Sequence, residues 1–412
     1  MYYNLMGDIM DRIVMHIDVN NAFLSWTAIY LLNNGYKYDI RNSYAVIGGD
    51  EKSRTGIVLA KSTSAKKMGI QTGETLYSAR KKCSVLKSYP PNYSFYIEMS
   101  NKLFKLLSKY TPDIEVASVD ECYLEYTGVK KIYGDELEFA QKIKKEIFDE
   151  LGFTVNIGIA NNKLCAKMAS DFEKPNRIHT LYSYEVEKKM YPLPVGELFG
   201  IGRMTAKKLN ELGIKTINDL AHTDLYFLSH YFKNQAVIMI NSAKGIDDSL
   251  VISDNEELKG IGNEITIDHD VSSKKELEQH LLYLADKVTR RLRNTNRYAF
   301  VVVLILKDKY FKRVTRQKKL KNATNVTDEI YKLSKQILEE MGEIEPVRLI
   351  GLRLGNLVEK TEHQISLFDD ICVHEKDESL DKTVDSLKNK FGSGIIKKAS
   401  LINVKHKDGL KK

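Results

Sequence analysis

Cysteine is scarce in this sequence, and the few cysteines form no recognisable pattern. Only four of the 412 residues are cysteine, at positions 83, 122, 165 and 372. They lie far apart and show no Cys-x-x-Cys spacing, so neither a zinc site nor a disulfide framework fits them. This use of cysteine is typical of a protein from a reducing compartment.

Long hydrophobic runs are also missing. No apolar stretch is long enough to span a bilayer. Residues 1–11 have neither the basic start nor the apolar core of a signal peptide. We therefore expect a cytoplasmic protein that is not bound to a membrane. A chain of 412 residues is too long for one core, which predicts two to four domains.

Charge is unevenly distributed. The formal net charge of the whole chain is +8, yet residues 287–321 hold thirteen Lys or Arg and a single acid, Asp308. This concentration favours a polyanionic partner, and nucleic acid before membrane. A solvated basic face without a partner is the alternative.

Two acidic residues, Asp120 and Glu121, interrupt a β-rich region. Residues 114–119 and 122–126 are rich in strand-forming side chains, whereas acids form strands poorly, so their presence needs a reason. An exposed turn is the simple explanation, because acids prefer the surface. A second apolar strand, residues 12–20, also ends in a carboxylate, that of Asp18.

Two such strands side by side would bring Asp18, Asp120 and Glu121 together. Three carboxylates repel one another unless a cation lies among them. Hard oxygen ligands select Mg²⁺ or Mn²⁺, and sites of this kind commonly share the metal with the phosphates of a substrate. The pattern therefore predicts a divalent metal site.

The rest of the first region is predicted to alternate between strands and helices. We expect a helix from Asn20 or Asn21, as the cap, to about residue 32, with free N–H groups that favour a phosphate. A short helix over residues 61–70 places Thr63 and Lys66 on one face, where they could hold a triphosphate.

Further strands and helices are expected along this region of the chain. The predicted strands are residues 44–48, 56–61 and 153–160, and the predicted helices are residues 93–111, 135–151 and 161–171. This order predicts a mixed sheet covered by helices, an α+β layer.

A glycine hairpin marks the next region, residues 180–250, which is predicted to be helical. Gly200 and Gly202 allow backbone N–H groups to approach an anion. With the following Arg203, Thr205 and Lys207, they indicate a helix-hairpin-helix that binds DNA phosphates without reading sequence.

Residues 247–259 are predicted to be a polar linker to a separate α+β unit, residues 260–357. Four strands and two helices are expected there, with the basic excess on the first helix and the two central strands. Arg313 and Arg316 belong to this excess. Such a surface would bind duplex DNA through phosphates, in a salt-sensitive way.

The tail from residue 357 is polar, apart from the peptide Gln-Ile-Ser-Leu-Phe at 364–368. Exposed Leu and Phe in a polar tail suggest a peptide that binds an apolar pocket of a partner. The alternative is a tail that folds back on its own domain. A further helix and strand are expected within residues 379–403, without an assigned role.

Three sequence blocks resemble the Y-family of translesion DNA polymerases, in its bacterial DinB/UmuC group. They are HIDVNNAF (16–23), SVDECYLEYTG (118–128) and GIANNKLCAKMASDFEKP (158–175). The hairpin FGIGRMTAKKLNELGI (199–214) and QISLF (364–368) add to the resemblance, which covers about residues 12–368.

The resemblance implies an α+β multidomain polymerase shaped like a right hand. The expected parts are a palm (1–22 and 88–178), small fingers (23–87), a helical thumb (179–248), a linker (249–259), an α+β little finger (260–357) and a C-terminal tail (358–412). A short fingers unit and the lack of any exonuclease-like segment predict low fidelity and tolerance of damaged templates.

The resemblance also implies roles for particular residues. Asp18, Asp120 and Glu121 would hold two Mg²⁺ ions, with the Val19 carbonyl as a further ligand. The backbone of Asn21 and Ala22, and the side chain of Lys163, would bind the triphosphate. Phe23 stands where the family's steric gate excludes a ribonucleotide, although core packing is its simpler role. Gln364, Leu367 and Phe368 would anchor a sliding clamp. The implied substrates are primer–template DNA and dNTP. The resemblance also implies a monomer that is associated with the nucleoid.

This sequence departs from the family pattern at three places. Thr63 and Lys66 stand where the family often has Tyr and Arg, and lysine lacks the bidentate fork of arginine. Asn20 replaces an Asp common in the DinB branch and resembles the UmuC branch, so both branches remain open. Two other functions also remain: a palm-fold nucleotidyl cyclase, and a non-catalytic scaffold of the DNA-damage response.

Overall fold

The computed structural model describes residues 2–3, 9–10, 12–51, 54, 56–253, 258–359, 371–392, 394–396 and 398–401. The chain divides into two compact units. The first is built mainly from residues 12–49 and 57–253, and the second mainly from residues 258–401.

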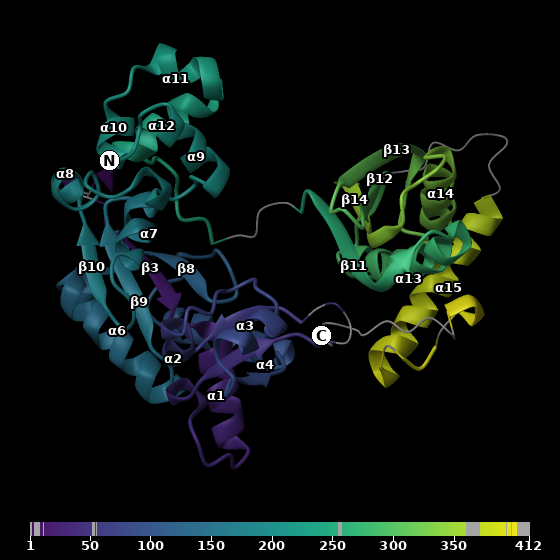
Figure 1. Ribbon diagram of the computed structural model, residues 1–412, viewed down its shortest axis with the longest axis horizontal. Helices are drawn as coiled ribbons and strands as arrows, with labels where there is room; N and C mark the ends of the chain where they lie inside the picture. The colour runs from purple at the N-terminus through teal and green to yellow at the C-terminus, as the bar shows by residue number, and fades with distance from the viewer. Residues whose placement is uncertain are drawn as a thin grey trace. The chain divides into compact units, whose positions relative to one another are not determined.

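A five-stranded sheet, the central sheet, organises the first unit (Figure 1). Its strands, in spatial order, are β10 (Ile178–Leu181), β9 (Val155–Ala160), β3 (Val14–Val19), β8 (Glu121–Glu125) and β7 (Ile114–Val116). β10 runs parallel to β9, and the other neighbours are antiparallel. This confirms the predicted mixed sheet.

Helices cover both faces of the central sheet. Met15 and Ile17 of β3 are fully buried in a core with Trp26. That core is closed by α1 (Ala22–Asn33), α4 (Tyr93–Leu107) and α6 (Glu136–Leu151). Alternate residues of a strand point to opposite faces, so Asp18 lies on the other face. That face packs against α7 (Lys163–Asp171). Figure 1 shows α6 and α7 on either side of the sheet.

Gly158 of β9 lets α7 approach the sheet closely. A Cβ at this position would lie 2.0 Å from the Ala166 carbonyl oxygen and 2.5 Å from the Ser170 nitrogen. Any larger residue would push the helix away. The side chains on the inner face of α7 therefore reach the end of β3.

A smaller sheet follows α1 in the chain. Its order is β5 (Val58–Lys61), β4 (Ala45–Gly48) and β6 (Lys87–Tyr89), and it carries η1 (Ile40–Asn42), α2 (Thr63–Lys67) and α3 (Leu76–Lys82). The strands and the short helix predicted here are present with nearly the expected bounds.

Residues 183–243 are helical, as the sequence predicts, and share one core with α7. The helices are η4 (Ser183–Glu185), α8 (Val186–Lys189), η5 (Val195–Glu197), α9 (Arg203–Glu211), α10 (Ile217–Ala221), α11 (Leu225–Phe232) and α12 (Gln235–Ala243). Short elements elsewhere are β1 (Tyr2–Tyr3), β2 (Ile9–Met10), η3 (Thr127–Val129), α5 (Lys130–Tyr133) and η6 (Ala399–Leu401).

The second unit is a four-stranded sheet with helices. Its strands are β11 (Gly260–Val271), β12 (Tyr298–Asp308), β13 (Arg313–Thr324) and β14 (Val347–Val358), in the spatial order β11-β14-β12-β13. The helices α13 (Lys274–Asn294) and α14 (Thr327–Glu340) share its buried core. The prediction of four strands and two helices is confirmed, but β13 is an edge strand rather than a central one.

The helix α15 (Ile371–Phe391) packs on the second unit. Arg293 is 5% exposed and binds Asp385 at 2.6 Å and Asp381 at 3.0 Å. The expected helix in the tail is therefore present and begins earlier than predicted. The described part of residues 379–403 contains no strand. No helix among the described residues is long and apolar enough to cross a membrane.

Two local predictions were only partly correct. Asn21 is the N-cap residue of α1, as expected, but no side-chain hydrogen bond caps the helix. The Asn21 amide donates to the Lys61 carbonyl at 2.7 Å, and the Asn20 amide donates to Asn156 at 3.0 Å. The helical spacing of Leu137, Ala140, Ile143 and Ile147 predicts one buried face of α6, but Leu137 is 42% exposed, and Phe139 is buried with the other three.

Candidate active site

The three predicted carboxylates come from adjacent strands. Asp18 of β3 stands directly opposite Glu121, the first residue of β8. The N–H of Val19 donates to the Asp120 carbonyl at 2.9 Å. Directly opposite residues of an antiparallel pair project to the same face, so Asp18 and Glu121 both face α7. The strand ends thus place all three acids, and Val19, at one corner of the central sheet.

The charges at this corner influence one another. Burial raises the pKa of Asp120, and the neighbouring charges of Asp18 and Glu121 raise it further. The Ser118 hydroxyl donates to Asp120 Oδ1 at 2.6 Å and opposes this rise. A carboxyl group that resists ionisation beside two others indicates that the cluster needs more positive charge than the protein supplies.

Glu121 behaves in the opposite way, because it has cationic and polar neighbours. A hydrogen bond with His16 lowers the pKa of Glu121 most, and Lys167 lowers it further. Burial opposes this shift, and the resulting pKa is about 2. His16 is fully buried, with Nε2 lying 3.4 Å from Glu121 Oε2 and Nδ1 2.8 Å from the Ser170 hydroxyl. Burial lowers the pKa of His16 itself, so the imidazole is neutral at pH 7.

Two lysines that the sequence analysis did not single out bind the carboxylates. Lys167 Nζ lies 2.6 Å from Glu121 Oε2 and 3.4 Å from Asp18 Oδ2. Lys174 Nζ lies 2.8 Å from Asp18 Oδ2. Despite burial, these carboxylates raise the pKa of both lysines. The sequence did contain a hint of the role of Lys167, because this residue is one helical turn after Lys163 on the helix expected to cover the sheet.

The donor set suits a hard divalent cation. No group of three His, Cys, Asp or Glu side chains in the described residues is arranged to hold a metal ion. The oxygens of Asp18 and Glu121 instead meet ammonium groups. Asp18 and Glu121 attract cations at this corner, and Asp120 lies beside them. Carboxylate oxygens are the donor type of the all-oxygen sites of Mg²⁺.

The first turn of α1 begins beside this corner. Asn21 has φ +50°, a left-handed conformation, and precedes Ala22, the first residue of the helix. Unpaired N–H groups at such a helix start attract phosphate. The Asn21 amide bonds to Lys61, which ties α1 to the end of β5. Burial, and then the charge of Lys66, lower the pKa of Lys61. Lys61 is thus a further cation near Lys66 that the sequence analysis missed.

Phe23 is half-buried and held by aromatic neighbours. Its ring stacks on Tyr96 at a centroid distance of 4.7 Å and meets Tyr93 edge-on at 6.1 Å. The ring therefore packs against the core and keeps part of its surface exposed, so both roles expected for it are compatible with its place. Thr63 and Lys66 lie exposed on α2, three residues apart.

Lys163, the first residue of α7, does not bind Asp18, Asp120 or Glu121. Its Nζ lies 2.7 Å from both carboxylate oxygens of Glu115, on β7. Glu115 is another residue that the sequence analysis did not single out. The sequence offered little indication of Glu115, since a single acid in a strand has no distinctive spacing.

The glycine hairpin of residues 200–202 leaves its backbone open. Gly200 has φ +91°, and a Cβ at Gly200 or Gly202 would meet nothing within 4 Å. Arg203 and Lys207, one turn apart on α9, line a cavity of about 670 Å³ beside it. Thr205 does not line this cavity and is half-buried. Of the predicted hairpin residues, only Arg203 and Lys207 line this cavity, and Gly200 and Gly202 are likewise not part of its lining.

Arg313 and Arg316 lie on opposite faces of β13, so the predicted shared surface is wrong. Arg316 pairs with Leu304, which is buried under the helices, whereas Arg313 pairs with Lys307 on the open face. The spacing of three residues along a strand requires this outcome. Arg353 of β14 is exposed on the open face, in register with Val303.

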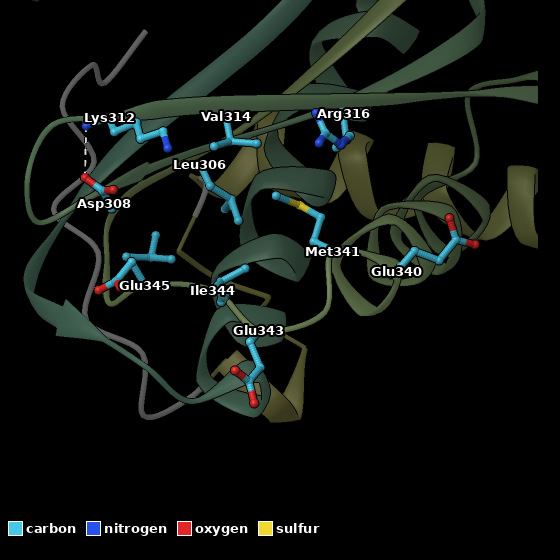
Figure 2. A pocket seen from close by; sticks show the side chains of 11 residues that line it. Leu306, Asp308, Lys312, Val314, Arg316, Glu340, Met341, Glu343, Ile344 and Glu345 are labelled. Atoms are coloured by element: carbon cyan, nitrogen blue, oxygen red, sulfur yellow. Dashed lines mark hydrogen bonds between the residues drawn. The ribbon is translucent and has the colours of Figure 1, made fainter.

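Arg316 lines a cavity of about 330 Å³ in the second unit. Figure 2 shows Arg316 on the same side of the strands as Met341. Four carboxylates also line the cavity, those of Asp308, Glu340, Glu343 and Glu345. Such a lining repels a polyanion, so this cavity is a poor site for DNA.

One predicted feature, the clamp-binding peptide, lies outside the described residues. Gln364, Leu367 and Phe368 fall outside, so the structure describes nothing of the proposed clamp peptide. The described cysteines at 83, 122 and 165 are free and buried.

Comparisons of the sequence with known families give three matches. Residues 17–171 match the impB/mucB/samB family, residues 185–214 match the helix-hairpin-helix motif of the same family, and residues 258–367 match its C-terminal domain. The matched ranges cover the central sheet, the glycine hairpin and the second unit.

Similar curated proteins carry one name. The chain is 44% identical over 399 residues to DNA polymerase IV of Clostridium acetobutylicum, with 97% of this chain and 100% of that protein covered. It is 36% identical to DNA polymerase IV of Clostridium kluyveri, with 95% and 99% covered. A solved Y-family DNA polymerase chimera of Dbh and Dpo4 superposes with a TM-score of 0.74 at 27% identity, covering 84% of this chain and 100% of the chimera.

Proposed function

The chain belongs to the Y-family of DNA polymerases, in its DinB branch, and on this premise we propose an assignment of its active site. The enzyme is a DNA-directed DNA polymerase that carries out low-fidelity translesion synthesis. The fold is that of a right hand with palm, fingers, thumb and little finger. The cyclase and scaffold alternatives are not favoured.

We propose that the reaction takes place at the corner formed by Asp18, Asp120 and Glu121. One observation carries this proposal: Asp18 is remote in sequence from the Asp120–Glu121 pair, yet the three acids meet at the ends of β3 and β8, where Asp18 and Glu121 bind lysine side chains. When bound, two Mg²⁺ ions would activate the primer 3′-hydroxyl and neutralise the leaving pyrophosphate. The carboxylates, with the Val19 carbonyl, would hold the ions in place.

The remaining residues bind and orient the dNTP. The N–H groups of Asn21 and Ala22 donate hydrogen bonds to the triphosphate at the start of α1. Thr63 and Lys66 of α2, together with Lys163, add a hydroxyl and two ammonium groups. Because lysine offers point charges rather than a fork, this set holds the phosphates less rigidly than arginine.

Phe23 is assigned to the exclusion of ribonucleotides. Its ring lies at the start of α1, five residues after Asp18, and Tyr96 stacks on it. A ring held in this way leaves no room for a 2′-hydroxyl on a sugar placed against it. The role depends on its rigidity, because a mobile side chain would give way.

DNA contacts are assigned to two surfaces. Gly200, Gly202, Arg203 and Lys207 present open backbone and two cations to the phosphates of the duplex. In the second unit the open face of the sheet carries Arg313. Arg316 and Thr205 are left out of the assignment.

The finer features of the cellular role are also proposals. Gln364, Leu367 and Phe368 bind the sliding clamp, the enzyme acts as a monomer, and it works on the nucleoid in the bacterial cytoplasm. The domain bounds proposed are palm 1–22 and 88–178, fingers 23–87, thumb 179–248, little finger 260–357 and tail 358–412. The small sheet, the helices of residues 183–243 and the second unit support these divisions.

Primer extension tests the assignment. The native enzyme and Asp120→Ala are compared with a primer–template, dNTPs and Mg²⁺, and separately with ATP alone. We expect extension by the native enzyme only, and no cyclic product. Equal extension by both proteins would remove Asp120 from catalysis, and a product formed without primer–template would restore the cyclase.

A further inference from the structure

The segment after the thumb, residues 247–252, is fastened to the palm and is called here the connecting segment. The Leu164 N–H donates to Asp247 Oδ2 at 3.0 Å. Arg12 Nη1 donates to the Ser249 carbonyl at 2.7 Å. The sequence predicted a free linker from residue 247, but its first half is bound to the palm surface.

Lys163 and Glu115 provide a further attachment for the connecting segment. Lys163 Nζ lies 2.7 Å from each oxygen of Glu115 and donates to the Leu250 carbonyl at 3.3 Å. The N–H of Ile252 donates to Glu115 Oε2 at 3.0 Å. One ion pair therefore holds two backbone groups of the segment, a carbonyl through Lys163 and an N–H through Glu115.

The ammonium group of Lys163 has no donor left. A lysine ammonium has three N–H donors, and here they meet three acceptors: both oxygens of Glu115 and the Leu250 carbonyl. The side chains of Lys163 and Glu115 are only 15% and 25% exposed. A phosphate oxygen can therefore bind Lys163 only when one of these acceptors is given up.

We propose that the incoming nucleotide and the connecting segment compete for Lys163. This inference rests on the proposed role of Lys163 in triphosphate binding. The contact to Leu250 is the longest of the three and involves a neutral acceptor, so it is given up first. Nucleotide binding thus loosens the segment, which leads along the chain to β11 of the little finger.

Amide hydrogen exchange of the full-length enzyme tests this competition. The peptide covering residues 249–253 is followed with primer–template and Mg²⁺, with and without a non-hydrolysable dNTP analogue at saturation. We expect the analogue to accelerate exchange at Ile252 about fivefold, the change expected when one hydrogen bond of ordinary strength is weakened. In Lys163→Met, exchange is fast without the analogue and does not respond to it, and nucleotide affinity falls.

Glu125→Gln is a matched control. Glu125 accepts from Arg12 Nε at 2.9 Å and so supports the attachment of Ser249 without contacting Lys163. This variant should loosen the segment in the absence of nucleotide and, because a looser segment competes less well for Lys163, raise nucleotide affinity slightly, while exchange at Ile252 still responds to the nucleotide. Glu115→Gln should raise nucleotide affinity about fivefold, because the partly exposed ion pair no longer retains Lys163.

The outcomes separate two failures. Unchanged exchange at Ile252 in the native enzyme, with analogue binding demonstrated, overturns the competition alone. Native nucleotide affinity in Lys163→Met overturns the triphosphate role of Lys163, and the competition with it. A Glu125→Gln enzyme that loses the nucleotide response would show that general loosening, rather than Lys163, carries the signal, which also overturns the proposal.

Discussion

Replacing Lys167 by methionine should destabilise the metal-free enzyme and make its stability depend strongly on Mg²⁺. The Lys167 side chain is 11% exposed, and its Nζ contacts Glu121 at 2.6 Å and Asp18 at 3.4 Å. Methionine keeps most of the length of the stem but lacks the charge. In the variant, the two carboxylates therefore lose an ammonium that lies between them.

The magnitude follows from the burial of the partners. Removing one member of a buried ion pair costs about 3–5 kcal/mol in free energy of unfolding. Asp18 and Glu121 are 15% and 28% exposed, and Lys174 still binds Asp18, so we reduce the cost to about 2 kcal/mol. For a unit of this size, that corresponds to a fall in Tm of about 6 °C.

Thermal unfolding with EDTA and across an Mg²⁺ titration measures the effect. Mg²⁺ should remove most of the difference in Tm between Lys167→Met and the native enzyme, because a divalent ion restores the positive charge. The variant should also need less Mg²⁺ for half of its stabilisation. Lys145→Met is the control, since Lys145 is 77% exposed and pairs with Asp149 on the surface of α6. A Tm loss of equal size with and without Mg²⁺ would refute the reasoning.

Four further outcomes are expected. Phe23→Ala should reduce discrimination against ribonucleotides by about 10- to 200-fold, measured as the ratio of kcat/KM for dNTP and rNTP; unchanged discrimination would remove the gate role. Glu121 has a pKa of about 2, below its ordinary 4.5, so its contribution to stability is complete above pH 4.5 and is lost as the pH falls toward 2. In the metal-free enzyme, Glu121→Gln should therefore reduce the loss of unfolding free energy between pH 4.5 and pH 2. An unchanged loss over this pH range would contradict the prediction. Arg203→Ala should lower the salt slope of DNA binding by about 1, whereas Met204→Ala, at an equally exposed site, should not; equal slopes in both would argue against a phosphate contact. Deleting residues 364–368 should abolish synthesis stimulated by the clamp and spare basal synthesis; loss of both would indicate a folding role.

Much of the palm could be predicted because its pattern is local. An apolar strand that ends in Asp18, and a pair of β-rich runs around Asp120 and Glu121, specify neighbouring buried strands. Burial of the strands then forces the acids to the sheet edge, because only there can a charged group keep water or a cation. No long-range information was needed for this step.

The cationic partners of these acids could not be predicted in the same way. Lys167 reaches Glu121 only because α7 lies close to β9, and that approach depends on Gly158, which is distant from both strands in the chain. The attachment of the connecting segment was equally invisible. Polar composition suggested a linker, whereas hydrogen bonds to its backbone, such as that of Ile252, depend on a neighbour more than a hundred residues away.

The misplacement of Arg316 has a different cause, which is the length of β13. A strand places residues three apart on opposite faces, so Arg313 and Arg316 could not share a surface once β13 was recognised as a continuous strand. The sequence analysis instead placed both arginines on one basic surface. Residues 315–319 are all polar, so no alternation with apolar residues marked the continuation of the strand to Thr324.

The most direct test of the central claim is anomalous scattering from crystals of the enzyme with primer–template, a non-hydrolysable dNTP analogue and Mn²⁺ in place of Mg²⁺. We expect two Mn²⁺ peaks within about 2.2 Å of carboxylate oxygens of Asp18, Asp120 and Glu121. Lys167 should then have moved away from Asp18. Crystals with a bound nucleotide analogue, no Mn²⁺ at these carboxylates and Lys167 still paired with Asp18 and Glu121 would contradict the account.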